Sequence, residues 1–248
     1  MTKAIVLAAG EGSRLRPYTT DRPKGMVEVN GKPILEYQYE TLKQAGVDDI
    51  IVVCGYQQDK ISSSSCRLIK IHNERWSTTN MVASLFCAKE WLNDDVIISY
   101  ADIIYQLPVL KQLLKSEADI TVSSDKEFLR YWQLRMADPL DDVESFSVND
   151  EGFITSIGQK VESLDQIEAQ YIGLMRFKGT GLEVLKQYLD RLSNTIGFNT
   201  MYMTDLLMVM IQGGVRLTPL YHQNGWVEID TIEDLKLAER ILQGKISI

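Results

Sequence analysis

An apolar run near the start of the chain, residues 3–9, ends abruptly at a loop of small residues that begins with Gly10. The run, KAIVLAA, has the length and composition of a buried strand. Small residues after such a strand let backbone N–H groups approach a phosphate closely, because no Cβ lies in the way. Arg14 and Lys24 follow in the same loop and supply positive charge. The pattern predicts a polyphosphate-binding loop at the end of a strand.

Two common phosphate-binding loops do not match this segment. A P-loop ends in Gly-Lys-Ser or Gly-Lys-Thr, which is missing here. A dinucleotide fingerprint requires glycine where Leu15 stands. Pro17 and Pro23 also prevent a helix from starting directly at the glycines. A simple turn with a surface arginine is the alternative for an isolated Gly-x-Gly, but it does not account for the whole run from Leu7 to Lys24.

The hydrophobic pattern predicts an α/β fold. Expected strands cover residues 3–9, 49–56, 96–100, 119–124, 215–221 and 226–230. Expected helices cover residues 33–45, 80–92, 107–116, 180–193 and 200–212, and a last helix opens with a capping box at Thr231. This alternation implies a Rossmann-like, three-layer αβα arrangement around a mixed, mostly parallel sheet.

Between about residues 128 and 178 the character of the sequence changes. Short runs such as RYWQLRM, FITSIG and YIGLMRF predict antiparallel strands added to one edge of the sheet. We therefore expect one domain over residues 1–248, with a small antiparallel β excursion that binds the acceptor.

Composition limits the class of protein. The net charge of -8 argues against nucleic-acid binding through an overall positive charge. An odd number of cysteines (Cys54, Cys66 and Cys87) and two distant histidines predict reduced thiols in a cytoplasmic protein and no zinc cluster. The first apolar run is too short for a signal peptide, and no segment approaches a membrane span. The oligomeric state stays open, with a homo-oligomer among the alternatives.

Two aspartates follow apolar strands directly. Asp102 comes after VIISYA and Asp230 after WVEI. Ligands of open α/β sheets bind at the carboxyl ends of strands, and Mg²⁺ favours one or two carboxylates there. Each aspartate could instead be a helix cap or a turn residue. We predict that both bind Mg²⁺.

The run LAAGEGSRLRPYTTDRPK resembles the signature of nucleotidyltransferases that act on sugar phosphates and phosphocholine-type substrates. The resemblance implies the fold of this nucleotidyltransferase family, and it implies catalytic roles at the triphosphate for Arg14 and Lys24. YADIIY and VEIDT are similar to the two metal-binding segments of the family, with Ala101 where glycine is common. The nucleotide-binding residues implied by the loop are Leu7, Ala8, Ala9, Gly10, Gly12 and Ser13.

Other segments resemble parts of the same family that bind the substrates. WSTTNMVASL resembles the segment that reaches the base and ribose in cytidylyltransferases, which implies Asn80 and Ser84; the alternative is a helix cap and a buried small residue. IGQK resembles a segment that holds the acceptor phosphate through Lys160, although Gln159 and Val161 replace the usual Glu and Pro. Lys160 is otherwise a surface lysine.

YWQLRMADPLDDVESF and IEAQYIGLMRF resemble cytidylyltransferases of phosphocholine, aminoethylphosphonate and related amino compounds. The resemblance places Trp132, Arg135, Glu144 and Tyr171 at the acceptor. Trp132 could bind an ammonium group by a cation–π contact or belong to the core.

We therefore expect a Mg²⁺-dependent enzyme that transfers CMP from CTP to a small phosphorylated amino compound, such as a phosphocholine, a phosphonate or a phosphoglutamine, and releases pyrophosphate. The alternative is a sugar-1-phosphate nucleotidylyltransferase, which would normally show Gly-Asp and Glu-Lys-Pro at the two sites above. A nucleotide-sensing module would have lost Lys24 or an aspartate. A glycosyltransferase of similar fold would carry an Asp-x-Asp motif, which does not occur at the predicted strand end, where the sequence reads Ala-Asp-Ile.

Overall fold

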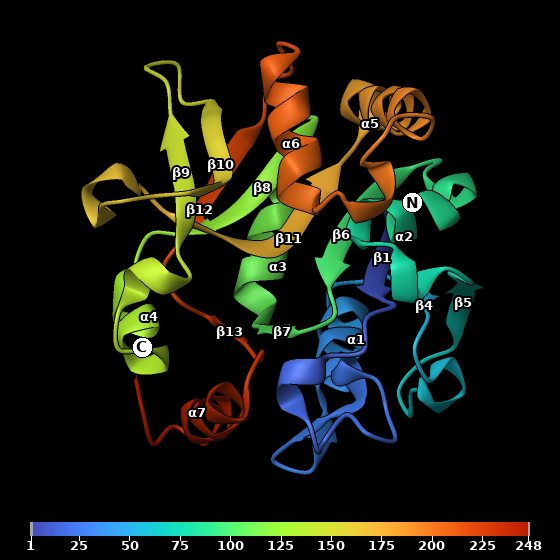
Figure 1. Ribbon diagram of the computed structural model, residues 1–248, viewed down its shortest axis with the longest axis vertical. Coiled ribbons are helices and arrows are strands. Elements are labelled where there is room, and N and C mark those ends of the chain that lie inside the picture. Colours follow the sequence, from blue (N-terminus) through green and yellow to red (C-terminus); the bar gives the residue numbers. More distant parts are fainter. Residues whose placement is uncertain (1, 248) are drawn as a thin grey trace.

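A computed structural model describes residues 2–247 of the chain. Its centre is a seven-stranded sheet in the order β12-β8-β11-β6-β1-β4-β5 (Figure 1). The strands are β1 (Thr2–Ala8), β4 (Asp49–Cys54), β5 (Leu68–His72), β6 (Asp95–Tyr100), β8 (Ile120–Asp125), β11 (Gln170–Phe177) and β12 (Thr218–His222). Three two-stranded sheets join β2 (Glu28–Val29) to β3 (Lys32–Pro33), β7 (Ile103–Tyr105) to β13 (Trp226–Glu228), and β9 (Glu144–Val148) to β10 (Ile154–Lys160).

The middle of the sheet is parallel and buried on both faces. β1 pairs in parallel with β4 and β6, and five of its seven residues are buried. Continuous burial of this kind requires helices on both sides of the sheet. Strand β11 is the exception in direction, because it runs antiparallel between β6 and β8.

Seven α-helices surround the sheet in residues 2–247. They are α1 (Ile34–Gln44), α2 (Met81–Cys87), α3 (Leu107–Lys115), α4 (Phe128–Arg135), α5 (Gly179–Leu192), α6 (Met203–Gln212) and α7 (Ile232–Leu242). α1 follows β1 outward to β4 while α2 leads from β5 back to β6, so right-handed crossovers place them on opposite faces. α3 contacts α1 and α6 contacts α2, which completes the predicted three layers. Within residues 2–247, none of these helices has the length and apolar character that spanning a bilayer demands.

The fold class predicted from the sequence is confirmed, but the prediction for residues 128–178 was wrong in two respects. β11 lies inside the sheet and not at its edge, because seven of its eight residues are buried and such a strand needs neighbours on both sides. The run RYWQLRM belongs to helix α4, whose buried residues Phe128, Tyr131 and Trp132 have helical spacing. The part that leaves the main sheet is the β9–β10 pair, beside α6 in Figure 1.

The topology brings distant parts of the chain to one edge of the sheet. β1, β4 and β6 are parallel and end there together. Directly after β6, strand β7 pairs antiparallel with β13, so that Ile103 faces Glu228. The backbone N–H of Ile229 donates to the carbonyl oxygen of Asp102 over 2.9 Å. This pairing sets the predicted aspartates, 128 positions apart in sequence, side by side.

Candidate active site

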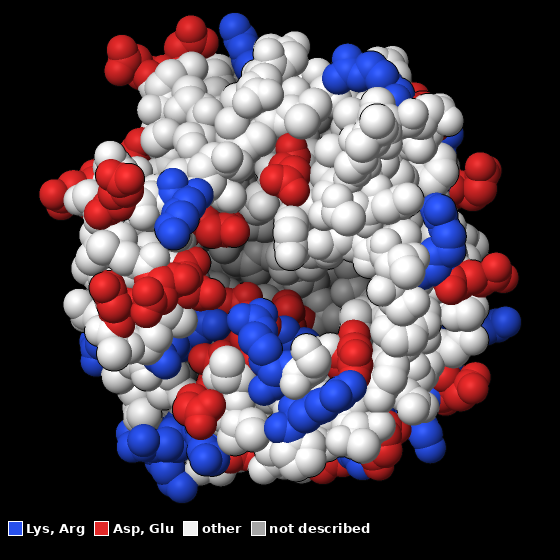
Figure 2. Space-filling view, in the orientation of Figure 1, with Lys and Arg blue, Asp and Glu red and all other residues white. Residues whose placement is uncertain are grey.

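Two adjoining pockets open at this edge, and Figure 2 shows the hollow with charged side chains along one rim and mostly uncharged atoms along the other. The loop pocket is lined by Leu7, Ala8, Ala9, Gly10, Gly12, Lys24, Gly25, Trp76, Thr79, Asn80, Met81, Ser84, Ala101, Asp102 and Tyr202. The aromatic pocket is lined by Arg14, Met81, Tyr100, Asp102, Trp132, Asp142, Glu144, Gln170, Tyr171, Ile172, Gly173, Tyr202, Thr204, Trp226, Glu228 and Asp230. The two pockets share Met81, Asp102 and Tyr202, so a molecule in one pocket reaches the other beside Asp102.

The glycine-rich loop wraps one side of the loop pocket. Gly12 has φ +71°, a conformation that other residues adopt at a cost. A Cβ at this position would also lie 2.6 Å from Cβ of Lys24. Glycine is therefore required here both by the backbone and by the close approach of the lysine.

Contacts from the rest of the fold hold this loop in place. Leu15 is fully buried and anchors the loop in the core. The Thr19 hydroxyl donates to the carbonyl oxygen of Gly12 over 2.9 Å. The Tyr56 hydroxyl lies 3.1 and 2.9 Å from the carbonyl oxygens of Thr19 and Thr20. The loop is thus shaped before any ligand arrives, which lowers the entropy that binding must remove.

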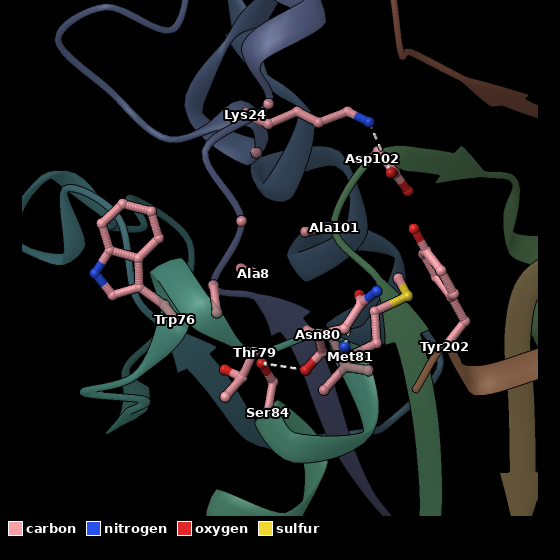
Figure 3. A pocket seen from close by; sticks show the side chains of 15 residues that line it. Ala8, Lys24, Trp76, Thr79, Asn80, Met81, Ser84, Ala101, Asp102 and Tyr202 are labelled. Atoms are coloured by element: carbon pink, nitrogen blue, oxygen red, sulfur yellow. Dashed lines mark hydrogen bonds and ion pairs between the residues drawn. The ribbon is translucent and has the colours of Figure 1, made fainter. Parts of the chain in front are cut away.

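The far side of the loop pocket is formed by the start of α2. In Figure 3, Lys24 crosses the top of the pocket toward Asp102, Trp76 stands on the opposite wall, and Asn80 and Ser84 lie below. Asn80 caps α2, since its side-chain oxygen accepts from the N–H of Met81 over 2.8 Å. The buried Ser84 hydroxyl donates to the Asn80 carbonyl oxygen over 3.2 Å. Both residues therefore have the structural roles that the alternative reading gave them, and both also line the pocket.

Three carboxylates gather where the pockets meet. One oxygen each from Asp102, Glu228 and Asp230 lies within 4.8 Å of the others. The Lys24 ammonium bridges two of them: Nζ lies 2.7 Å from Oδ2 of Asp102 and also donates to Asp230. The other Asp102 oxygen, Oδ1, is buried and has no hydrogen-bond partner among the described residues. An unpartnered carboxylate oxygen beside two further carboxylates suits a hard divalent cation.

The charges in this cluster are strongly coupled. Burial works against the charge of Lys24, but the carboxylates of Asp102 and Asp230 outweigh it and raise the pKa of the lysine. Burial likewise opposes ionisation of Asp230, and Lys24 and Arg14 reverse the effect, so its pKa is lowered. Burial raises the pKa of Glu228 to about 8. A bound cation would favour its ionised form.

Arg14 stands at the mouth of the aromatic pocket. Its Nη2 lies 3.1 Å from Oδ2 of Asp230, and its side chain is 65% exposed. A long cationic side chain with that freedom can move onto an incoming anion, in contrast to Lys24, which is largely enclosed. Ser13, next to Arg14, is exposed in the same turn and lines neither pocket, so its contact with the nucleotide stays a prediction.

Aromatic side chains make the walls of the second pocket. Trp132 is 4% and Trp226 is 3% exposed, and their ring centroids are 5.9 Å apart. The rings of Tyr100 and Tyr171 meet edge to face at 5.6 Å. The buried Asp125 orients Trp226, because its Oδ2 accepts from the indole N–H over 2.9 Å. These aromatic faces suit a cationic group.

Glu144 supplies an acidic group to the same pocket. Glu144 as a whole residue is exposed, but desolvation of its carboxyl group first, and then the charges of Asp142 and Asp205, raise the pKa of that carboxyl to about 7. Gln170 clamps the Glu144 backbone from both sides: its Oε1 accepts from the Glu144 N–H over 3.1 Å, and its Nε2 donates to the Glu144 carbonyl oxygen over 2.5 Å. A carboxylate held in such a place favours a positively charged partner.

Two predicted acceptor residues lie outside the pocket. The Arg135 side chain is only 2% exposed and lies behind the pocket wall, where it pairs with carboxylates. The structure therefore does not bring Arg135 into the lining of either pocket, and it adjoins the predicted acceptor residue Trp132 from behind. Lys160 is opposite Glu144 in the β9–β10 ladder but is exposed, and it lines neither pocket. Its role at the acceptor phosphate stays a prediction from the sequence.

Several lining residues were missed in the sequence. Glu228 had a signal, because it stands two positions before Asp230 and side chains two apart in an extended segment point the same way. Trp226, on the same strand, follows the same rule. Tyr202 had no such signal, since it enters only because the segment before α6 folds against α2: the Asn80 N–H donates to the carbonyl oxygen of Asn199 over 2.6 Å.

Comparison with known proteins places this geometry in context. Residues 4–154 match the model of the MobA-like NTP transferase domain. The chain is 39% identical to the CTP:phosphoglutamine cytidylyltransferase of Campylobacter jejuni, over 94% of this chain and 98% of that protein. It is 36% identical to the choline-phosphate cytidylyltransferase of Streptococcus pneumoniae, over 46% of this chain and 51% of that protein.

Solved structures show the same fold. The CTP:phosphocholine cytidylyltransferase from Streptococcus pneumoniae superposes with a TM-score of 0.74 at 24% identity, covering 97% of this chain and 99% of that one. The inositol-1-phosphate CTP transferase from T. maritima gives a TM-score of 0.78 at 21% identity, over all of this chain and 98% of that one.

Proposed function

The chain belongs to the MobA-like NTP transferase family, and from that premise we propose that it transfers CMP from CTP to the phosphate of a small phosphorylated amino compound. The observation that carries the proposal is the junction of the two pockets at Asp102. A nucleotide in the loop pocket and an acceptor in the aromatic pocket would meet with their phosphates beside the carboxylate cluster. Phosphoglutamine is the first acceptor to consider, because the relative that matches nearly the full chain is named for it.

The loop pocket suits a nucleoside triphosphate. Its small residues Ala8, Ala9, Gly10 and Gly12 leave backbone groups open to phosphate oxygens. Asn80 and Ser84 line the pocket from the start of α2, where their polar groups can meet a base or ribose. Lys24 and Arg14 provide the charge that a triphosphate requires, from the enclosed and the exposed side respectively.

The aromatic pocket suits an amine more than a sugar. Its rim carries several carboxylates, and only Arg14 among its lining residues is basic. An ammonium group would gain from the ring faces of Trp132 and Tyr171 and from the carboxylate of Glu144. A neutral sugar ring would leave these carboxylates without a cation. Arg14 is positioned to meet the acceptor phosphate at the end that faces Asp230.

The reaction requires little proton transfer. An oxygen of the acceptor phosphate is already anionic and attacks the α-phosphorus of CTP. The new P–O bond forms as the bond to the bridging oxygen breaks, and pyrophosphate leaves with that electron pair. Positioning and charge neutralisation account for the acceleration in such a transfer. Lys24, which lines the loop pocket and contacts Asp102 at the junction of the two pockets, is placed to stabilise charge at the α-phosphate.

Magnesium is the cation we propose for the carboxylate cluster. Asp102 and Asp230 would hold it, with Glu228 as a third oxygen donor, and the unpartnered Oδ1 of Asp102 fits this role. Bound there, the ion would neutralise phosphate charge and favour departure of pyrophosphate.

A pyrophosphate-release screen tests the proposal. Each of the four nucleoside triphosphates is combined with phosphoglutamine, phosphocholine, aminoethylphosphonate and glucose 1-phosphate in the presence of Mg²⁺. We expect turnover with CTP and one of the amino compounds, and mass spectrometry should identify a CDP- or CMP-linked product. Turnover only with UTP or dTTP and the sugar phosphate would replace the proposal with a sugar-phosphate nucleotidylyltransferase.

A further inference from the structure

The enclosed Arg135 side chain connects two parts of the site. One is the wall of the aromatic pocket at Trp132, called here the acceptor wall, and the other is the cluster of Asp102, Glu228 and Asp230. Its Nη1 donates to Oε2 of Glu228 over 2.7 Å. Its Nε donates to Oδ1 of Asp234 over 2.9 Å, and Nη2 lies 3.4 Å from the other oxygen of that carboxylate. Nη2 also lies 4.0 Å from Oδ2 of Asp230. One guanidinium therefore contacts two of the three carboxylates that would hold the cation, without facing either pocket itself.

Asp234 extends this connection to the backbone. Its Oδ2 accepts from the N–H groups of Asp230 and Thr231 over 3.1 and 3.0 Å. The Thr231 hydroxyl in turn accepts from the Asp234 N–H over 3.1 Å, which completes the capping box of α7. The pair of Arg135 and Asp234 thus fixes both the main chain and the side-chain surroundings of Asp230.

On its other side, Arg135 supports the acceptor wall. Its guanidinium carbon lies 5.1 Å from the ring centroid of Trp132. Trp132 Nε1 donates to Oδ2 of Asp142 over 3.0 Å, and Arg135 Nη1 lies 3.5 Å from the same oxygen. A shift of the guanidinium would therefore move the tryptophan face and the cation-binding carboxylates together.

We propose that Arg135 is a positioning residue that sets the geometry of the cation site and of the acceptor wall at the same time. The proposal rests on the proposed function, since it assigns Glu228 and Asp230 to the cation and Trp132 to the acceptor. The forked guanidinium is essential in this role, because two directions of hydrogen bonding must be held at once. A point charge at the same place keeps the electrostatic balance but not the orientation. Mutation of a residue that hydrogen-bonds to a metal ligand typically changes metal affinity by about 10- to 100-fold.

Arg135→Lys is the discriminating variant, because it keeps the charge and removes the fork. We expect the Kd for Mn²⁺ alone, followed by electron paramagnetic resonance, to rise at least about tenfold. At saturating Mg²⁺ we expect KM for the acceptor to rise several-fold while KM for CTP changes less than about twofold. Asp234→Glu, which keeps both the charge and the capping-box chemistry, should weaken Mn²⁺ binding in the same direction. It serves as the second test if the lysine variant does not fold.

Arg176→Lys is the matched control. Arg176 is also buried and paired with a carboxylate, since its Nε donates to Oδ1 of Asp95 over 2.7 Å. It belongs to β11, and its side chain reaches the C-terminal end of α3, where Nη1 donates to the carbonyl oxygen of Leu114 over 2.7 Å; it lines neither pocket. A loss of stability alone should appear in both arginine variants. A loss of Mn²⁺ affinity should appear only in the Arg135 variant.

Unchanged Mn²⁺ affinity in both Arg135→Lys and Asp234→Glu would overturn the inference, and so would an equal loss in Arg176→Lys. The failure of the proposed function has a different signature: the wild-type protein would release no pyrophosphate with CTP and any amino acceptor. The Mn²⁺ measurement needs no substrate, so it stays informative in that case.

Discussion

Replacing Lys24 by methionine should strengthen cation binding and weaken turnover in the same protein. The Lys24 ammonium bridges Asp102 and Asp230, the two aspartates that would hold a divalent ion. In the free protein the ion must therefore displace the lysine. Methionine has a similar length and no charge, so the variant removes the competitor and leaves the carboxylates in place.

The size of the effect follows from the contacts. A hydrogen bond between charged groups contributes about 1.5–3 kcal/mol net. Nζ makes two such bonds, and its contact with Oδ2 of Asp102 is 2.7 Å long. Since about 1.4 kcal/mol corresponds to a tenfold change in an equilibrium constant, removal of even one bond predicts at least about tenfold tighter Mn²⁺ binding. Turnover should fall by about 100- to 1,000-fold, because the charge that stabilises the α-phosphate in the transition state is missing.

Mn²⁺ titration of the free protein, with kcat measured in parallel, provides the assay. Lys32→Met is a suitable control, because Lys32 also makes a 2.7 Å ion pair, with Glu40, but lines neither pocket. We expect the control to change neither quantity. Weaker or unchanged Mn²⁺ binding in Lys24→Met would refute the view that the lysine and the cation share one position.

Three further predictions address the remaining parts of the site. Asp102→Asn should lower kcat at least about 100-fold while Tm stays within about 4 °C of the wild type, and near-normal turnover in this variant would contradict the assignment of the cation site. Glu144→Gln should remove the rise of kcat/KM for a cationic acceptor between about pH 6 and 8, because the pKa of the carboxyl is raised to about 7; an unaltered pH profile would show that the ammonium group binds elsewhere. Gly12→Ala should cost about 1–2 kcal/mol in stability and raise KM for CTP, whereas Gly46→Ala, with φ +82° but open space around it, should show only the loss of stability.

The sequence was most informative where chemistry depends on local spacing. The loop from Gly10 to Lys24 follows a strand directly, so its place at the sheet edge could be predicted. Asp102 could be predicted for the same reason, since it follows β6, which ends at that edge. The loop and Asp102 need only the rule that ligands bind at the carboxyl ends of parallel strands. Asp230 follows β13, which pairs antiparallel with β7 outside the main sheet, so its position depends on that pairing.

Prediction failed where a residue's role depends on packing. Arginine is a residue type that often binds ligands, but the Arg135 side chain is enclosed behind Trp132, where it supports other side chains. The antiparallel insertion of β11 into the centre of the sheet depends on long-range pairing with β6 and β8. Local sequence cannot reveal such pairing, because the partners lie about 45 to 80 positions away along the chain. Helix α4 was different, because its buried residues had helical spacing that could have been recognised.

The most direct test of the whole account is a crystal structure with the CDP- or CMP-linked product and Mn²⁺ bound. We expect the cytosine beside Asn80 and Ser84, the linked phosphates next to Asp102 and Asp230, and the amino end between Trp132 and Glu144. Anomalous scattering should place the metal at the carboxylate cluster. A cytosine in the aromatic pocket, or phosphates bound away from both aspartates, would contradict the proposed division of the site.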